Sequence, residues 1–185
     1  MKRSLALVGM LALIAGAAHA GPTADAEAAL DKDDTATAFA LYTKALAEAG
    51  KEPAARASAL YDRAEAYARY AKDPEALADY NEALALAPDP AFKALVLSSR
   101  GDLYAQERHY PEAIADYTQA HALNPDLAGV LTARGQVRQR MRDNDAALAD
   151  FDAELKIDPK YPKALRAKAR LLGQPDPTQI AEHPW

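Results

Sequence analysis

The fold is decided by residues 110–125, which read YPEAIADYTQAHALNP. The five letters at the centre of this stretch, AIADY at 113–117, recur as ALADY at 76–80 and as ALADF at 147–151. The first two copies are 37 residues apart and the last two are 34 apart. Eight residues after its aromatic, each copy is followed by a proline: Pro88, Pro125 and Pro159. Self-similarity at this period indicates stacked copies of one supersecondary unit.

Other positions repeat with the same offsets. An arginine and a small residue precede each copy, at Arg63-Ala64, Arg100-Gly101 and Arg134-Gly135. This order of residue types at a 34-residue period resembles the tetratricopeptide repeat: a small residue, a tyrosine, then Ala, an aromatic, Ala and Pro. The resemblance implies an all-α fold, a right-handed α-solenoid of antiparallel helix pairs with about four repeats plus a C-terminal capping helix.

The same register divides the chain into segments. It predicts an array over 21–173, made of a degenerate repeat at 23–56, full repeats at 57–90, 94–127 and 128–161, and a capping helix at 161–172. A proline-rich tail follows at 174–185, and its prolines exclude a continued helix. In the tail, Ile180 and Trp185 either belong to a disordered segment or dock onto the array or a partner.

The recurring spacing has a packing explanation. Ala64, Gly101 and Gly135 are small so that the second helix of the pair can approach the first. The aromatics Tyr80, Tyr117 and Phe151 are expected to fill space between neighbouring repeats.

Recurring charges allow two interpretations. Arg63, Arg100 and Arg134 recur together with Asp79, Asp116 and Asp150. We expect weak surface ion pairs between the two helices of each repeat; the alternative is a ladder of arginines that binds anions. In the third full repeat, Arg138 and Glu154 replace a tyrosine and an alanine, which suggests either an ion pair between them or two solvent-facing residues near a partner site.

The first twenty residues resemble a secretory signal peptide. Lys2 and Arg3 precede an apolar run over 5–17, and Ala18-His19-Ala20 has the small-x-small pattern of a cleavage site. We expect cleavage after Ala20 and a periplasmic or secreted protein, with a retained membrane anchor as the alternative. No stable membrane span is expected after cleavage.

The composition and the polar residues argue against several functions. The net charge of −5 does not favour nucleic acid as a partner, and the chain has no cysteine for thiolate chemistry. His109, His121 and His183 are not spaced as ligands on one helical face, and Ser58, Ser98 and Ser99 have no base placed beside them by the sequence. We therefore predict no enzyme activity, no metal site and no cofactor.

The resemblance does imply a binding site, because ligands of this family usually lie in the concave groove lined by the first helices. By register, the groove residues in this chain are Tyr61, Asp62, Glu65, Arg69, Leu95, Ser98, Asp102, Gln106, Thr132, Gln136, Gln139, Arg140, Lys163, Arg166 and Arg170. The groove would be acidic at its N-terminal end and basic at its C-terminal end, which could orient a peptide of opposite polarity. The alternative is that these residues are merely solvated helix faces.

The sequence therefore predicts a non-catalytic scaffold or adaptor of the cell envelope that binds a peptide or protein segment. The alternatives are a self-associating structural protein and an accessory subunit of an envelope enzyme complex.

Overall fold

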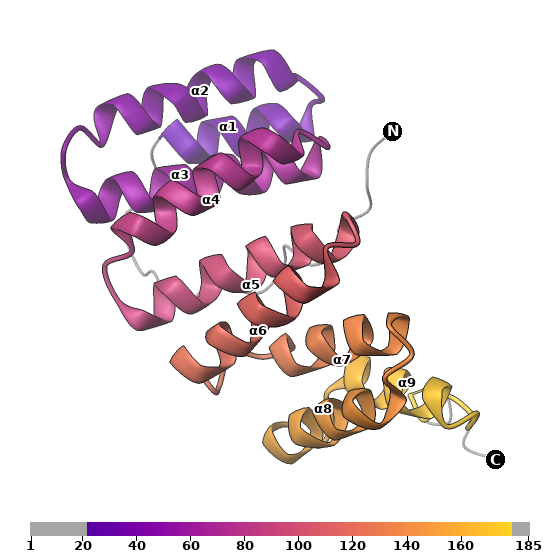
Figure 1. The fold of residues 1–185 in the computed structure, drawn as a ribbon. Coiled ribbons are helices and arrows are strands. Elements are labelled where there is room, and N and C mark those ends of the chain that lie inside the picture. Colours follow the sequence, from indigo (N-terminus) through magenta and orange to yellow (C-terminus); the bar gives the residue numbers. More distant parts are fainter. Residues whose placement is uncertain (1–21, 179–185) are drawn as a thin grey trace. The chain divides into compact units, whose positions relative to one another are not determined.

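The computed structural model describes residues 22–178 of the chain. The predicted signal peptide at 1–20 and the end of the tail, from residue 179, lie outside the described residues. Within 22–178 the structure consists of nine helices and no strand (Figure 1). The helices are α1 (Pro22–Asp31), α2 (Thr35–Glu48), α3 (Pro53–Arg69), α4 (Asp73–Leu86), α5 (Pro90–Gln106), α6 (Tyr110–Leu123), α7 (Val130–Arg140), α8 (Asn144–Ile157) and α9 (Pro162–Leu171). The predicted all-α fold, with four helix pairs and one closing helix, is confirmed.

The chain forms two compact units, one up to Asp89 and one from Pro90. In unit 1, α1 packs on α2 and α3 packs on α4, and α2 also contacts α3. In unit 2, α5 packs on α6 and α7 on α8, and α9 packs on α8. Helix α7 also contacts both α5 and α9. The first helices of unit 2 therefore lie side by side and can present one common face.

The two helices of each pair are joined by the same turn. It contains one residue in the left-handed region, Asp33, Ala71, Arg108 or Arg142, with φ between 57° and 65°. The next residue donates its N–H to a carbonyl five residues back, as in the 2.9 Å bond from Lys72 N to Tyr67 O and the 2.8 Å bond from His109 N to Tyr104 O. This is the Schellman motif, which closes the first helix and reverses the chain.

The rings of Tyr117 and Phe151 contact the small residue on the first helix of their own pair. A Cβ atom on Gly101 would lie 2.9 Å from Cε1 of Tyr117, and one on Gly135 would lie 2.6 Å from Cε1 of Phe151. The small residues therefore make room for these rings, as well as for the helix that carries them. The expectation that the rings fill the space towards the neighbouring repeat is borne out for Phe151, which also packs against Ala167 and Leu171 of α9.

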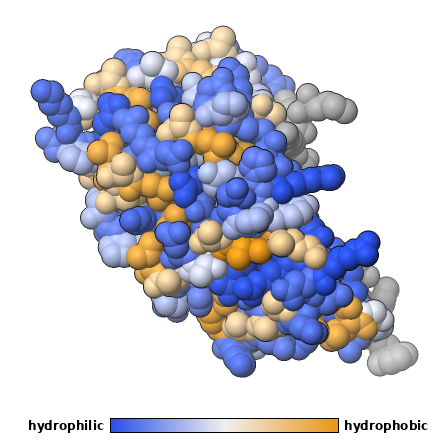
Figure 2. Space-filling model, in the orientation of Figure 1, coloured by the Kyte–Doolittle hydropathy of each residue, from blue (hydrophilic) through white to orange (hydrophobic). Residues whose placement is uncertain are grey.

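The drawn face of the molecule is mostly hydrophilic, with apolar residues in separate patches (Figure 2). The large apolar side chains that are most exposed lie at or just beyond helix ends: Leu123, Met141, Ile157 and Leu172. Among residues 22–178, no helix is long and apolar enough to cross a bilayer.

Candidate functional site

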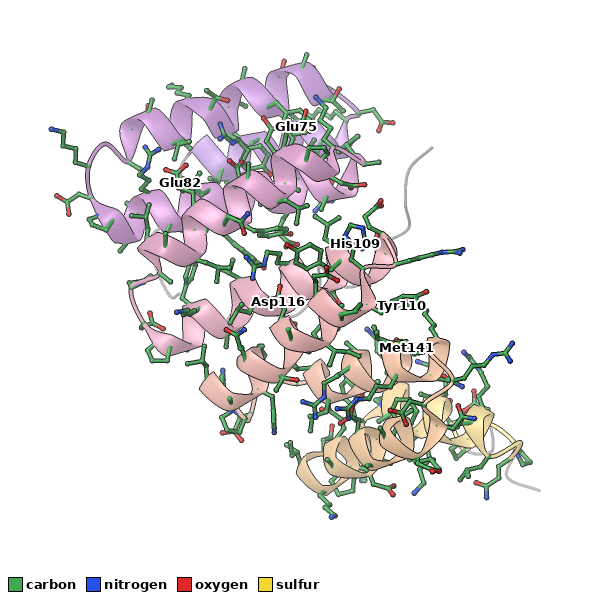
Figure 3. The ribbon with its side chains drawn as sticks, in the orientation of Figure 1. Glu75, Glu82, His109, Tyr110, Asp116 and Met141 are labelled. Atoms are coloured by element: carbon green, nitrogen blue, oxygen red, sulfur yellow. The ribbon has the colours of Figure 1, made fainter. Side chains whose placement is uncertain are left out.

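An arginine–aspartate pair joins the two helices in three of the helix pairs. Arg63 contacts Asp79, Arg100 contacts Asp116 and Arg134 contacts Asp150, each at 2.7 Å, and each arginine donates two hydrogen bonds to its carboxylate. The predicted pairing is confirmed. Figure 3 labels Asp116 on α6.

These pairs are not the surface interactions that we expected. The aspartate side chains are 4–7% exposed and the arginine side chains 14–18% exposed. Hydrogen bonds to the aspartates raise the pKa values of Arg63 and Arg100. The three guanidinium groups are thus held inside the helix pairs, which argues against a ladder that binds external anions.

The third full repeat departs from the predicted Arg138–Glu154 ion pair. Arg138 instead contacts Asp150 at 2.9 Å, so that Asp150 receives two arginines. Glu154 is 2% exposed and accepts hydrogen bonds from the backbone N–H groups of Gly129, at 3.0 Å, and Thr132, at 3.2 Å. Its carboxylate thus caps the N-terminus of α7. Thr132 is also 2% exposed, so this predicted groove residue is buried and does not lie on an open surface.

A second recurring interaction places a carboxylate on the first helix of a pair. The hydroxyl of Tyr80 donates to Glu65 at 2.5 Å, that of Tyr117 donates to Asp102 at 2.6 Å, and that of Tyr42 donates to Glu27. The carboxylate stands fifteen residues before its tyrosine in all three pairs. At the same spacing in the fourth pair, Gln136 and Phe151 replace both partners. The carboxylate is absent where the hydroxyl is absent.

These tyrosines fix the orientation of the carboxylates. Burial, together with the neighbouring carboxylate, raises the pKa of Tyr42 and of Tyr117. Each hydroxyl therefore keeps its proton and acts as a donor. Sequence reasoning selected Glu65 and Asp102 by register but missed Glu27 and the tyrosine hydroxyls. The constant spacing of fifteen residues was the signal that could have identified them.

In unit 1 the predicted groove residues lie together on α3. Tyr61, Asp62, Glu65 and Arg69 are all half-buried. Arg69 contacts Glu27 of α1 at 3.3 Å, and the ring of Tyr61 lies 6.3 Å from that of Tyr80. A cavity of about 210 Å³ is lined by Thr23, Ala24, Glu27, Tyr42 and Asp62. This face combines three carboxylates with one arginine.

In unit 2 the predicted residues come from three helices. Helix α5 carries Leu95, Ser98, Asp102 and Gln106. Helix α7 carries Gln136, Gln139 and Arg140, and helix α9 carries Lys163, Arg166 and Arg170. Of these, Leu95, Ser98, Gln139 and Lys163 are half-buried and the others are exposed.

Several cations of α7 and α9 interact electrostatically with neighbouring charges: Lys163 with Asp102 and Arg166, and Arg166 and Arg170 with Asp176. Burial lowers the pKa of Lys163, the charge of Asp102 opposes that shift, and the charge of Arg166 adds to it. Arg140 acts on Tyr117, the hydrogen-bond partner of Asp102. Among residues 22–178, Arg140, Lys163, Arg166 and Arg170 form no ion pair. We call this surface, formed by Asp102 and these four cations, the basic face of unit 2.

The structure also shows where the other polar candidates lie. His109 is exposed before α6, next to Tyr110 (Figure 3), and His121 is half-buried in the last turn of that helix. His183 lies outside the described residues. Over 22–178, no three His, Cys, Asp or Glu side chains are grouped so that they could hold a metal ion.

Residues 94–127 match the family model described as "Tetratricopeptide repeat". Several solved structures resemble the chain in fold. A tetratricopeptide repeat protein from Parabacteroides merdae is 22% identical with a TM-score of 0.69, covering 82% of this chain and 59% of its own. PilF of Pseudomonas aeruginosa is 23% identical with a TM-score of 0.69, covering 82% and 66%.

A third structure, the second tetratricopeptide-repeat domain of human RPAP3 in complex with an HSP70 peptide, is 26% identical with a TM-score of 0.59. It covers 65% of this chain and 98% of its own. This chain thus spans only about three fifths of the Parabacteroides protein but nearly all of the RPAP3 domain. No curated protein sequence matches the chain.

Proposed function

Because this chain carries a tetratricopeptide repeat and has the fold of tetratricopeptide-repeat proteins, we propose that it is a non-catalytic scaffold or adaptor that binds a peptide or protein segment. Proteins of this fold commonly mediate protein–protein interactions. The basic face of unit 2 carries the proposal furthest, because its four cations have no ion-pair partner among the described residues.

The chemistry of this face favours an acidic segment as its ligand. Four cations stand against two carboxylates. Asp102 already accepts a hydrogen bond from Tyr117, and Asp176 interacts electrostatically with Arg166 and Arg170. Charged groups that face solvent from several helices steer and orient a charged ligand. The peptide in the RPAP3 complex, SGPTIEEVD, is itself acidic. A short peptide with several Asp or Glu residues is therefore the probe that fits this face.

The test is fluorescence anisotropy with two labelled peptides of equal length, one rich in Glu and one rich in Lys. We expect the full chain to prefer the acidic peptide. The double variant Lys163→Glu with Arg166→Glu should lose about 1–2 kcal/mol of binding, or about 5- to 30-fold in Kd.

A matched control separates the face from the net charge of the protein. Lys156 and Lys160 are exposed outside the first helices, at the end of α8 and in the turn after it. Reversing both changes the net charge by the same amount and should leave the Kd nearly unchanged. Equal binding of the two peptides, or an equal loss in the control variant, would count against the basic face as the ligand site.

The proposal includes export from the cytoplasm. It is supported by the positive start, the apolar run and the cleavage triplet that ends at Ala20. Expression of the whole sequence in a bacterium should yield a periplasmic or secreted protein whose N-terminal residue, read by Edman degradation, is Gly21. A cytoplasmic protein that retains Met1 would disprove this part of the proposal.

A further inference from the structure

Helix α7 carries a buried hydroxyl group that has no hydrogen-bond partner. Thr132 is 2% exposed, and nothing in residues 22–178 forms a hydrogen bond with its Oγ1. The backbone N–H of the same residue, by contrast, donates to Glu154 at 3.2 Å. An unpaired buried hydroxyl costs free energy, so each such group in a folded protein requires an explanation.

Thr132 lies on the same face of α7 as two exposed residues. Gln136 and Arg140 follow it by four and eight residues, a spacing that places all three on one side of the helix. Both are exposed, and the equivalents of Thr132 on α3 and α5, Tyr61 and Ser98, are half-buried. A feature at the start of α7 therefore closes a position that stays partly accessible on α3 and α5.

The side chain that reaches this end of α7 is that of Tyr161, the residue before α9. A Cβ atom on Gly129, three residues before Thr132, would overlap the hydroxyl oxygen of Tyr161 and would lie 3.3 Å from its Cζ. There is room for this ring because α7 begins only two residues before Thr132, whereas α5 begins eight residues before Ser98. Tyr161 therefore lies against the shortened start of the helix.

Tyr161 differs from the tyrosines that hold the first-helix carboxylates. Those hydroxyls each donate a hydrogen bond, whereas the hydroxyl of Tyr161 has no partner in the described part of the chain. Burial, together with the nearby charges of Glu154, Asp158 and Asp102, raises its pKa, so the group stays neutral. The ring is half-buried, and its rotation to another rotamer breaks no hydrogen bond.

This closed position borders the basic face of unit 2. The charge of Asp102 acts on both Tyr161 and Lys163. Arg140, another cation of the basic face, stands eight residues after Thr132 on the same side of α7. A segment that lies along α7 from Arg140 towards the start of the helix therefore meets Tyr161 and, beneath it, Thr132.

We propose that Tyr161 is a lid over a subsite of the basic face, and that a bound peptide segment displaces it and accepts a hydrogen bond from Thr132 through a backbone carbonyl. The inference rests on the proposed binding of an acidic segment and adds a contact to the backbone of that ligand. A neutral carbonyl suits this position better than a carboxylate, because Glu154 already places a negative charge beside Thr132. With the lid closed the hydroxyl is unsatisfied, which reduces the free energy needed to open it.

The binding assay with the Glu-rich peptide tests the role of the hydroxyl. Thr132→Val keeps the shape of the side chain without the hydroxyl and should raise the Kd about 5-fold. Thr132→Ser retains the hydroxyl and should bind like the wild type. Thr43→Val makes the same change at an exposed position of α2 and should leave the Kd unchanged.

The melting temperature separates a ligand contact from a structural role. Because the hydroxyl has no partner while the lid is closed, Thr132→Val should melt at the temperature of the wild type or above it. Tyr161→Ala removes the lid and should lower the Kd, since no closed state then competes with the ligand. Far-UV circular dichroism shows that this variant retains its helices.

The outcomes distinguish this inference from the proposed function. A wild-type Kd or a lower melting temperature in Thr132→Val would overturn the subsite, and a higher Kd in Tyr161→Ala would overturn the lid. Either result is compatible with a basic face that binds acidic peptides. A wild-type chain that does not prefer the acidic peptide would overturn both proposals.

Discussion

Each buried Arg–Asp pair affects stability most when one partner is removed, because the charge of the other partner is then left behind. Moving two charges out of water costs free energy that their attraction only roughly repays, so an intact pair adds little net stability. An arginine left alone among buried groups is a different case, because its charge then has no compensation. The pairs therefore penalise any arrangement in which the two helices of a pair lose their register.

Asp116→Ala should for this reason lower the free energy of unfolding by about 3 kcal/mol. Asp152→Ala is the matched control in the same unit, because the Lys168–Asp152 pair is 36–49% exposed. It should cost about 0–1 kcal/mol. Urea unfolding followed by circular dichroism measures both losses, and similar losses in the two variants would show that burial does not set the strength of these pairs.

The tyrosine–carboxylate contact makes a prediction that depends on pH. Tyr117→Phe removes the hydrogen bond to Asp102 and should cost about 1 kcal/mol at neutral pH. In the folded wild type, the pKa of Tyr117 is raised above its ordinary value of 10.0. The unfolded chain therefore ionises this hydroxyl above pH 10 while the folded chain does not. The contribution of the neutral hydroxyl to the free energy of unfolding is fully present below pH 10 and decreases as the pH rises further.

The difference in stability between wild type and Tyr117→Phe should accordingly narrow above about pH 10. Urea unfolding of both proteins at neutral pH and above pH 10 gives the comparison. The other tyrosines are common to both proteins and cancel. A difference that stays constant across this range would mean that the hydroxyl is already free to ionise in the folded state.

At the scale of the element, α7 is shorter than α3 and α5, the first helices of the two preceding pairs. It has 11 residues, whereas α3 and α5 have 17 each. The missing first turns are replaced by a loop that ends at Gly129, whose φ is 86°. The buried carboxylate of Glu154 satisfies two N–H groups at this helix start. The equivalent residues on α4 and α6 are Ala83 and Ala120, because α3 and α5 begin earlier.

Glu154→Ala should therefore cost about 2–4 kcal/mol, since it removes two hydrogen bonds to a charged group and leaves buried donors unpaired. Lys156→Ala, an exposed change on the same helix, should cost less than about 0.5 kcal/mol. Hydrogen exchange of the α7 amides provides a local readout that should become faster in Glu154→Ala alone. A thermal melt unchanged by Glu154→Ala would contradict this role of the carboxylate.

Sequence periodicity was sufficient for the helices but not for their ends and partners. The recurring small residues, aromatics and prolines predict pairs of helices because each position has one geometric role. The start of α7 and the cap by Glu154 were missed, since both depend on an unusual loop that the register does not encode. The Arg138–Glu154 pair was mispredicted because Asp150 lies within reach of Arg138 and can accept from two arginines.

For the whole molecule, the candidate site was predictable in outline and not in detail. Register identified Glu65 and Asp102 correctly as first-helix residues, but it counted Thr132, whose side chain is buried. Periodicity specifies a position on a helix and cannot state how deeply a neighbouring loop covers it. Within each unit the structure shows a face of distinct charge, and the predicted gradient along one continuous groove stays a prediction.

The hydrogen bonds of Glu27, Glu65 and Asp102 have a consequence for how such a protein can grow. Each carboxylate is held by a tyrosine of its own helix pair, fifteen residues further along the same stretch of chain. One segment of about 34 residues thus contains both the carboxylate on the first helix and the hydroxyl that orients it. Duplication of that segment would add one oriented carboxylate to the row on the first helices without a second, compensating mutation elsewhere. The length of the surface and its chemistry can therefore change independently, one helix pair at a time.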